Sequence, residues 1–268
     1  MIRSDITFPS GEAFCAAWLY RPGDASDDSS QTRLIIVMAH GLGGVREMGL
    51  DAFAERFADA GYICLVFDYR YFGASGGAPR QLLSIRRQRE DWKAAIAYAR
   101  TVDGADPDRL IIWGTSFGGG HVMATAADDP SIAAAVAQCP FTSGLASSLA
   151  IPTLTAAKIG VRAVRDVVAS LRGKDPVMVP AYAGPGETAL MSAPDVVAGR
   201  RRRMRSPHPR GLRPGQRDHR PVRPRYHPEL PGTEAQGRDL PDPCRCLHEG
   251  LRRPARPHHQ VSRQGLHR

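Results

Sequence analysis

The sequence contains no asparagine, and no apolar run in it is long enough to span a membrane. Residues 1–5 are not followed by an apolar segment, so no secretory signal is expected at this end. The five cysteines form no paired framework, which argues against a disulfide-rich secreted domain. Cys15, Cys64 and Cys139 instead lie in apolar runs, as buried free thiols do. We therefore expect a cytoplasmic protein that does not enter a membrane.

The C-terminal segment, residues 200–268, lacks lysine, isoleucine, phenylalanine and tryptophan. It carries 18 Arg and 6 Asp+Glu, a net charge of +12, whereas residues 1–199 carry 18 Lys+Arg and 21 Asp+Glu, a net charge of −3. It also holds 11 of the 22 prolines and 7 of the 9 histidines. The basic total of +9 thus belongs to this tail. We expect a folded, mildly acidic domain over 1–199 and a separate Arg/Pro/His-rich tail.

The stretch Leu110–Gly120 (LIIWGTSFGGG) has the clearest chemical signature in the chain. A short apolar run ends at Gly114, a G-x-S-x-G motif centres on Ser116, and a helix-like segment follows Gly118. A strand, a tight turn and a helix in this order are what a nucleophile elbow requires. The sequence therefore predicts an activated serine at position 116. The alternative is a glycine-rich turn in which this serine only caps the helix.

Continuous apolar, β-rich runs alternate with amphipathic segments through the first half of the chain, which predicts a parallel sheet with helices on both faces. The expected strands are residues 5–8, 13–20, 34–39, 62–67, 110–113 and 132–137, and the expected helices are residues 49–60, 83–100 and 118–128. In such sheets the binding and catalytic sites lie beyond the carboxyl ends of the strands. His40, Asp68 and Ser116 each follow an expected strand, so we expect them at one edge.

The pattern changes between residues 141 and 195. Residues 153–172 form an amphipathic pattern, with Val161, Val164, Val168 and Leu171 on one stripe. Two interpretations remain open for this segment. It is either a helical cap over the site or an ordinary packing helix.

Four motifs carry a resemblance to the α/β-hydrolase superfamily, and in particular to its serine aminopeptidase-like and dienelactone hydrolase-like acyl hydrolases. They are H40-G-L-G-G44, D68-Y-R-Y-F-G-A-S75, D91-W-K-A-A-I and G114-T-S-F-G118. The likeness covers about residues 30–140 and extends through the cap to about residue 196. It implies an α/β-hydrolase fold and no metal or organic cofactor.

The resemblance also implies roles for individual residues. Ser116 would be the nucleophile, and the backbone N–H groups of Leu42 and Phe117 would form the oxyanion hole. The site-shaping residues would be His40, Gly41, Asp68, Arg70, Gly114 and Gly118. The resemblance favours structural support over substrate binding for Asp68 and Arg70.

The acid and base that should complete a catalytic triad are not recognisable. In this superfamily an Asp or Glu and then a His follow the serine, each after a late strand. The tail offers Asp218, Asp239 and Asp242 ahead of His248, His258, His259 and His267. None of them ends an apolar strand, and Leu, Val, Ile and Phe supply 8 of these 69 residues, too few to build two core strands. We therefore expect a sheet without its last strands, and both triad partners stay unknown.

Three interpretations of the tail compete. An out-of-frame reading of GC-rich DNA would explain its Arg, Pro, Gly and His content and the abrupt change near Gly199. A genuine basic segment could instead bind nucleic acid, although it lacks interleaved aromatic residues and does not explain a shortened fold. Cys244, Cys246 and His248 could hold a metal, but their spacing is too short and isolated for a structural zinc site.

We therefore expect a serine hydrolase that cleaves an ester, thioester or amide bond in a small acyl or peptide-like substrate. Its turnover is expected to be impaired in this chain because the triad acid and base are not in evidence. The alternatives are a noncatalytic hydrolase-fold protein and a nucleic-acid-binding protein that acts through its basic tail. The substrate and the oligomeric state are not specified by the sequence.

Overall fold

The structure is a computed structural model that describes residues 1–23, 32–149 and 151–192. The strands are β1 (Ile2–Ser10), β2 (Ala13–Arg21), β3 (Arg33–Ala39), β4 (Ile63–Phe67), β5 (Ala105–Thr115) and β6 (Ile132–Gln138). The helices are α1 (Leu50–Asp59), α2 (Ile85–Ala99), α3 (Phe117–Asp128), α4 (Gly144–Leu149) and α5 (Thr153–Leu171). The interpretations of the tail, residues 200–268, concern a segment outside the described residues.

In the described part of the chain, the strands form one sheet in the order β1-β2-β4-β3-β5-β6. β4, β3, β5 and β6 run parallel, and β2 pairs antiparallel with both β1 and β4. Every residue of β4 is buried, and five of the seven in β3 are buried, as their continuous apolar runs predict. The mostly parallel α/β sheet expected from the sequence is confirmed.

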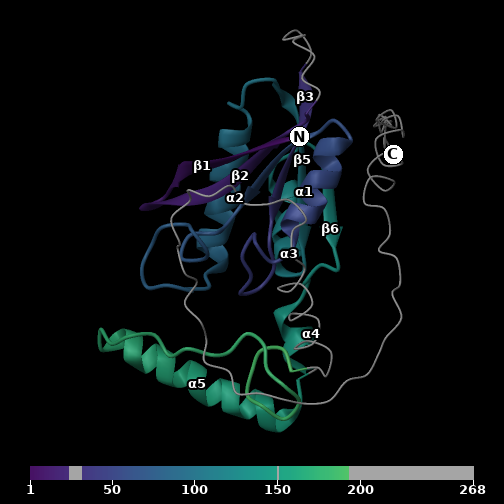
Figure 1. Cartoon of the computed structure of the whole chain (residues 1–268). Helices are drawn as coiled ribbons and strands as arrows, with labels where there is room; N and C mark the ends of the chain where they lie inside the picture. Colours follow the sequence, from purple (N-terminus) through teal and green to yellow (C-terminus); the bar gives the residue numbers. More distant parts are fainter. Residues whose placement is uncertain (24–31, 150, 193–268) are drawn as a thin grey trace, which may run out of the picture.

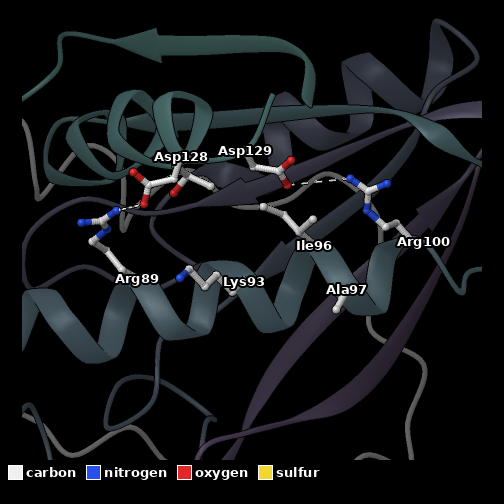
Figure 2. Close-up of a pocket in the computed structure, with 8 residues that line it drawn as sticks. Arg89, Lys93, Ile96, Ala97, Arg100, Asp128 and Asp129 are labelled. Carbon is white, nitrogen blue, oxygen red and sulfur yellow. Dashed lines mark hydrogen bonds and ion pairs between the residues drawn. The ribbon is translucent and has the colours of Figure 1, made fainter. Parts of the chain in front are cut away.

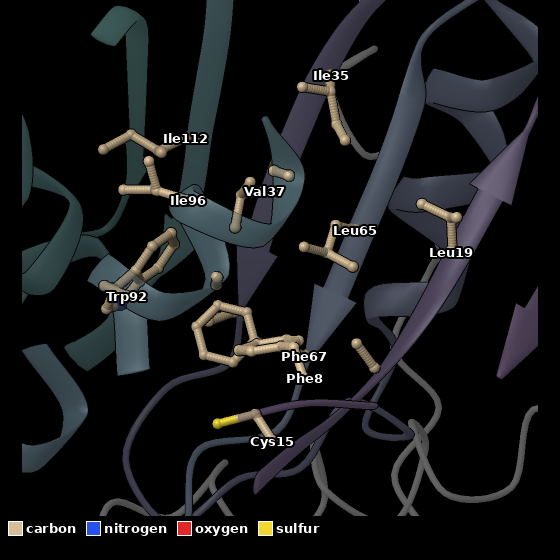
Figure 3. Packing of buried hydrophobic residues seen from close by; sticks show 14 of the residues in the cluster. Phe8, Cys15, Leu19, Ile35, Val37, Leu65, Phe67, Trp92, Ile96 and Ile112 are labelled. Atoms are coloured by element: carbon tan, nitrogen blue, oxygen red, sulfur yellow. The ribbon is translucent and has the colours of Figure 1, made fainter. Parts of the chain in front are cut away.

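Helices cover both faces of the sheet. α1 packs on one face, where Phe57 meets Trp113, Met38 and their neighbours in one apolar cluster. α2 and α3 cover the other face, and Figure 3 shows Trp92 of α2 beside Phe67 of β4. Their rings meet edge to face with centroids 5.2 Å apart. These two cores fix the position of the strand ends where the candidate site lies.

Most boundaries lie within one or two residues of the sequence-based prediction, and the larger differences are in β1 and β5. The turn between β1 and β2 falls at Gly11 and Glu12, because Pro9 still belongs to β1 and pairs with Phe14 of β2. A proline is tolerated there because β1 is an edge strand in the described sheet. β5 begins at Ala105 rather than at residue 110. Residues 106–109 (DPDR) are polar or proline and lie partly or fully exposed, so a continuous apolar run marks only the later part of the strand.

One of the three thiols expected to be buried is exposed. Cys15 and Cys64 are buried, as their runs predict, whereas Cys139 is exposed. β6 ends at Gln138, and Cys139 adopts φ 44° in the turn that follows. Its side chain therefore leaves the strand and is not packed in the sheet.

The chain beyond β6 is arranged differently. α5 lies across the lower part of Figure 1, away from the sheet, with α4 between them. The predicted helix is present, but its apolar stripe is not covered by the described residues. Val161 is 61% exposed, Val164 65% and Leu171 82%. None of the helices in the described ranges is long and apolar enough to cross a membrane.

Candidate active site

Ser116 occupies a sharp turn between β5 and α3. Its backbone has φ 55° and ψ −116°, which is a sparsely populated region for a residue other than glycine. The turn is held by the neighbouring strand end: Ser116 N–H donates to the Gln138 carbonyl at 2.9 Å, and Phe141 N–H donates to the Ser116 carbonyl at 2.9 Å. The Ser116 side chain makes no capping hydrogen bond to α3. The geometry thus differs from the capping role considered as the alternative.

Two glycines let the backbone segments around Ser116 come close together. A Cβ on Gly114 would lie 2.4 Å from the Gly118 carbonyl oxygen, and a Cβ on Gly118 would lie 2.5 Å from the His40 carbonyl oxygen. Real Cβ atoms do not approach backbone so closely. The outer glycines of the G-x-S-x-G motif therefore allow α3 to sit directly against β5 and against the end of β3.

The loop after β3 runs beside Ser116. A Cβ placed on Gly41 would lie 3.0 Å from the Ser116 Cβ and 3.5 Å from its Oγ. The loop closes on itself where Gly44 N–H donates to the Gly41 carbonyl at 3.2 Å, with Gly43 at φ 60°. Leu42 lies inside this turn, and Phe117 begins α3 directly after the serine. The oxyanion roles of their two N–H groups stay predictions.

His40 is buried and is not placed as a free base. Its Nδ1 lies 2.9 Å from the Gly41 carbonyl oxygen, so this nitrogen carries the proton. Its Nε2 lies 3.6 Å from Asp68 Oδ1. Burial lowers the His40 pKa, and the Asp68 charge only partly opposes this. Nε2, the unprotonated nitrogen of the neutral ring, is buried and has no hydrogen-bond partner among the described residues. The Nδ1 bond ties the ring to the loop after β3, in keeping with the structural role implied by the resemblance.

Asp68 ties two loops together at the same edge of the sheet. One carboxylate oxygen accepts the backbone N–H of Arg46 at 2.8 Å, and the other accepts that of Ala74 at 3.2 Å. The Arg46 guanidinium lies 3.5 Å from this carboxylate and is itself buried. The sequence analysis did not identify Arg46, because no local pattern marks a buried arginine in a glycine-rich loop.

Arg70 is fully buried and supports the loop that contains Asp68. Its Nε donates to Asp91 at 2.5 Å, and its two terminal nitrogens donate to Glu12 and Glu90, each at 2.8 Å. The guanidinium thus joins the β1–β2 turn to α2. Asp91 was quoted only as part of a motif, although an acidic residue beside Trp92 on the buried face of α2 could have signalled a partner for this arginine.

His121 is also unsuited to activating Ser116. Its Nε2 lies 2.8 Å from Gln88 Oε1, and its ring packs edge-on against Phe117. Burial, and then the charge of Arg89, lower its pKa to about 4. His40 and His121 are the two histidines in the described ranges, and the remaining triad candidates lie outside them. Within those ranges no group of three or more His, Cys, Asp or Glu could hold a metal ion.

A groove between α2 and the end of α3 does not belong to this site. Figure 2 shows Arg89 and Lys93 on α2, and Arg100 directly after it, on the side of the groove opposite Asp128 and Asp129. Ion pairs cross the groove from Arg89 to Asp128 and from Arg100 to Asp129. The 12 residues of α3 separate it from Ser116 by about 18 Å of helix rise. These side chains are paired with one another and do not converge on an opening beside the serine.

Comparisons with known proteins agree with the fold. The model of the family described as serine aminopeptidase, S33, matches residues 30–181. Quorum-quenching protein AidA of Acinetobacter baumannii is 57% identical over 195 residues, which cover 73% of this chain and 62% of that protein. Thiohydrolase aneE of Aspergillus aculeatus is 31% identical over 147 residues, which cover 54% of this chain and 46% of that protein.

A solved structure is also similar. The α/β hydrolase GrgF from Penicillium superimposes with a TM-score of 0.57 and 26% identity, covering 70% of this chain and 61% of that one. The chain spans less than two thirds of the length of each of these three relatives. The match of the family model over more than half of the chain and the sheet topology lead to one assignment: the chain belongs to the serine aminopeptidase (S33) family of the α/β-hydrolase superfamily.

Proposed function

We propose that this chain carries the site of a serine hydrolase in which Ser116 is the nucleophile. One observation carries the proposal: Ser116 stands at φ 55° at the start of α3, with its hydroxyl free of any capping bond to the helix. A backbone in that region is strained and persists where the surrounding structure holds it. Here the end of β6 and three glycines hold it and leave the hydroxyl beside the loop after β3.

The proposed reaction is acyl transfer to the serine, followed by hydrolysis. Ser116 Oγ attacks the carbonyl carbon of an ester, thioester or amide, and the carbonyl oxygen becomes an oxyanion. The backbone N–H groups of Leu42 and Phe117 donate hydrogen bonds to that oxygen, assisted by the positive end of the α3 dipole. The acyl–heteroatom bond then breaks, and its electron pair leaves with the alkoxide, thiolate or amine, which takes up a proton to balance the one lost from Oγ. Water adds to the acyl enzyme, the bond to Oγ breaks, and the acid leaves as Oγ regains its proton.

The general base is the missing part of this mechanism. His40 is buried with its Nδ1 at the Gly41 carbonyl oxygen, and His121 packs against Phe117 and lies 2.8 Å from Gln88 Oε1. A base would have to come from outside the described residues, where the candidate histidines lie. Without it the serine stays a weak nucleophile, and the oxyanion hole alone supports a residual rate. We therefore expect slow turnover from this chain.

The relatives support an acyl substrate. One is named a thiohydrolase, and another is named a quorum-quenching protein. Thioesters and esters have better leaving groups than amides, so they suit a serine that lacks a strong base. We propose a small, apolar acyl ester or thioester as the substrate class and rank peptide-like amides second.

The test is hydrolysis of p-nitrophenyl acetate by the purified full chain. We expect slow release of p-nitrophenol, with Ser116→Ala reduced to the uncatalysed background and Ser4→Ala, on the exposed edge strand, equal to the parent. Labelling by a fluorophosphonate probe should follow the same order. Equal rates for the parent and Ser116→Ala would refute the assignment of the nucleophile. Fast Ser116-dependent turnover would show instead that the tail supplies a base, and the expected impairment would then be wrong.

A further inference from the structure

A side-chain hydrogen bond joins the segment after α5 to the loop that contains Leu42. The Tyr182 hydroxyl donates to the Leu42 carbonyl oxygen at 2.7 Å, across 140 residues of sequence. The neighbouring residues are in contact as well, since a Cβ on Gly43 would lie 3.0 Å from the Ala181 Cβ. The two segments therefore lie side by side at the edge of the sheet that carries Ser116.

The segment that carries Tyr182 has its own internal support. Met191 N–H donates to the Ala181 carbonyl at 3.0 Å, and Ala183 N–H donates to the Met191 carbonyl at 3.1 Å. Leu190 N–H donates to the Pro180 carbonyl at 3.0 Å. These bonds close residues 180–191 into a loop around Tyr182. The phenol is therefore presented from a defined backbone.

Leu42, in contrast, lies in flexible sequence. It is flanked by Gly41 on one side and by Gly43 and Gly44 on the other, and glycine has the widest range of backbone conformations. A hydrogen bond to the Leu42 carbonyl restricts rotation about its backbone. The Leu42 N–H belongs to the preceding peptide unit, whose Gly41 carbonyl accepts from Gly44 N–H at 3.2 Å and lies 2.9 Å from His40 Nδ1. The Tyr182 bond holds the following unit, so the backbone of Leu42 is fixed from both sides, in the loop that Gly41 brings up to the Ser116 hydroxyl.

We propose that Tyr182 is a positioning residue for the oxyanion hole, acting through its hydrogen bond to the Leu42 carbonyl. The inference rests on the proposed function and extends it, because it assigns a role to a residue beyond α5 that no sequence motif marks. Tyr182 touches neither the substrate nor the reacting atoms in this proposal. Its hydroxyl holds the peptide unit that follows the one carrying the Leu42 N–H, and so restricts the backbone of the donor residue.

The test compares Tyr182→Phe with Tyr98→Phe in the full chain. Tyr98 lies on α2, where its ring stacks on Phe8, so this variant removes a hydroxyl away from Ser116. For Tyr182→Phe we expect the Ser116-dependent kcat on p-nitrophenyl acetate to fall about tenfold, the size of one lost hydrogen bond. KM should change less than about twofold, because the bond serves the transition state more than the bound substrate. Tyr98→Phe should keep the parent kcat.

The outcomes separate this inference from the function on which it rests. A Tyr182→Phe variant with the parent kcat would overturn the positioning role while leaving Ser116 as the nucleophile. A fall in kcat that comes with a clearly lower melting temperature would assign the bond to folding, and a fall with a parallel rise in KM would assign it to substrate binding. Either result would also overturn the positioning role. A parent indistinguishable from Ser116→Ala would refute the proposed function itself, and the role of Tyr182 would fall with it.

Discussion

The chain up to the end of β6 and the chain after it use apolar residues in opposite ways. In the first region, strand residues such as Ile35 and Leu65 are fully buried between two helical layers. In the second region many large apolar side chains are exposed to solvent in the described structure. They are Leu145, Leu149, Leu154, Val161, Val164, Val167, Val168, Leu171 and Met178. The apolar residues of the first region are buried by other residues of that region. The apolar surface of the second region is not covered by the described residues.

Helices α1 and α5 differ in the same way. α1 and α5 are both amphipathic, but α1 buries Leu50, Ala54 and Phe57 against the sheet. α5 buries Thr155 and leaves its apolar stripe exposed. Amphipathicity therefore predicts where a helix forms, and tertiary packing decides how much that helix contributes to stability.

The largest effect should come from breaking the buried ion network of the first region. Arg70→Ala leaves Asp91, which is fully buried, without the charged partner that lies 2.5 Å away. Removing one member of a buried pair costs about 3–5 kcal/mol, because the other charge stays desolvated. Urea unfolding followed by tryptophan fluorescence should report that loss. Arg165→Ala, on the exposed surface of α5, is the matched control and should change the free energy of unfolding by less than about 0.5 kcal/mol.

This prediction would be contradicted by similar losses in the two variants. Such a result would mean that α5 is as tightly integrated as α2, and the contrast between the regions would disappear. A small loss for Arg70→Ala alone would mean that water enters and solvates Asp91 in the variant.

A loss of intermediate size in the free energy of unfolding should appear as pH falls, because the first region buries neutral histidines. The pKa of His121 is lowered from 6.5 to about 4 by burial. Above pH 6.5 the imidazole is neutral in both the folded and the unfolded chain. Below it, the unfolded chain binds a proton that the folded chain cannot, so stability is lost between pH 6.5 and about pH 4. Residues 141–192 contain no histidine and cannot contribute this dependence.

The measurement is the free energy of unfolding in urea at about pH 7 and about pH 5. The parent should lose about 2 kcal/mol more than His121→Gln over this interval, since each pH unit below the unfolded pKa contributes about 1.4 kcal/mol. His40, whose pKa burial also lowers, is present in both proteins and cancels from the difference. Parallel curves for the parent and the variant would show that His121 is accessible to protons in the folded state.

The sequence predicted most of the first region and little of what holds its site together. β3, β4 and the elbow follow from local patterns: continuous apolar runs, and glycines on either side of Ser116. The bonds of Asp68 and Arg70 could not be predicted, because their partners lie 6–58 residues away and come together only in the fold. The contact of Tyr182 with Leu42 spans 140 residues and has no local signal at all.

The second region was less predictable for a different physical reason. The apolar stripe with Val161 and Val164 correctly predicted the helix at 153–172, which the structure places at Thr153–Leu171. An apolar stripe indicates that one face of a helix is suited to burial. It does not identify the surface that covers this face. The cap interpretation and the packing-helix interpretation share one pattern, so sequence periodicity cannot separate them. The triad acid and base depend on residues outside the described ranges.

The smallest effect should come from the exposed stripe itself. Val164 is 65% exposed, so Val164→Ser removes little contact and should change the free energy of unfolding by less than about 0.5 kcal/mol. Val37→Ser, at a fully buried position of β3, is the matched substitution and should cost more than about 2 kcal/mol, since it removes apolar volume and buries a hydroxyl. A loss above about 1.5 kcal/mol at Val164 would mean that another segment or a second molecule covers α5 in solution. Repeating the measurement at several protein concentrations would separate those two cases, because only cover by a second molecule depends on concentration.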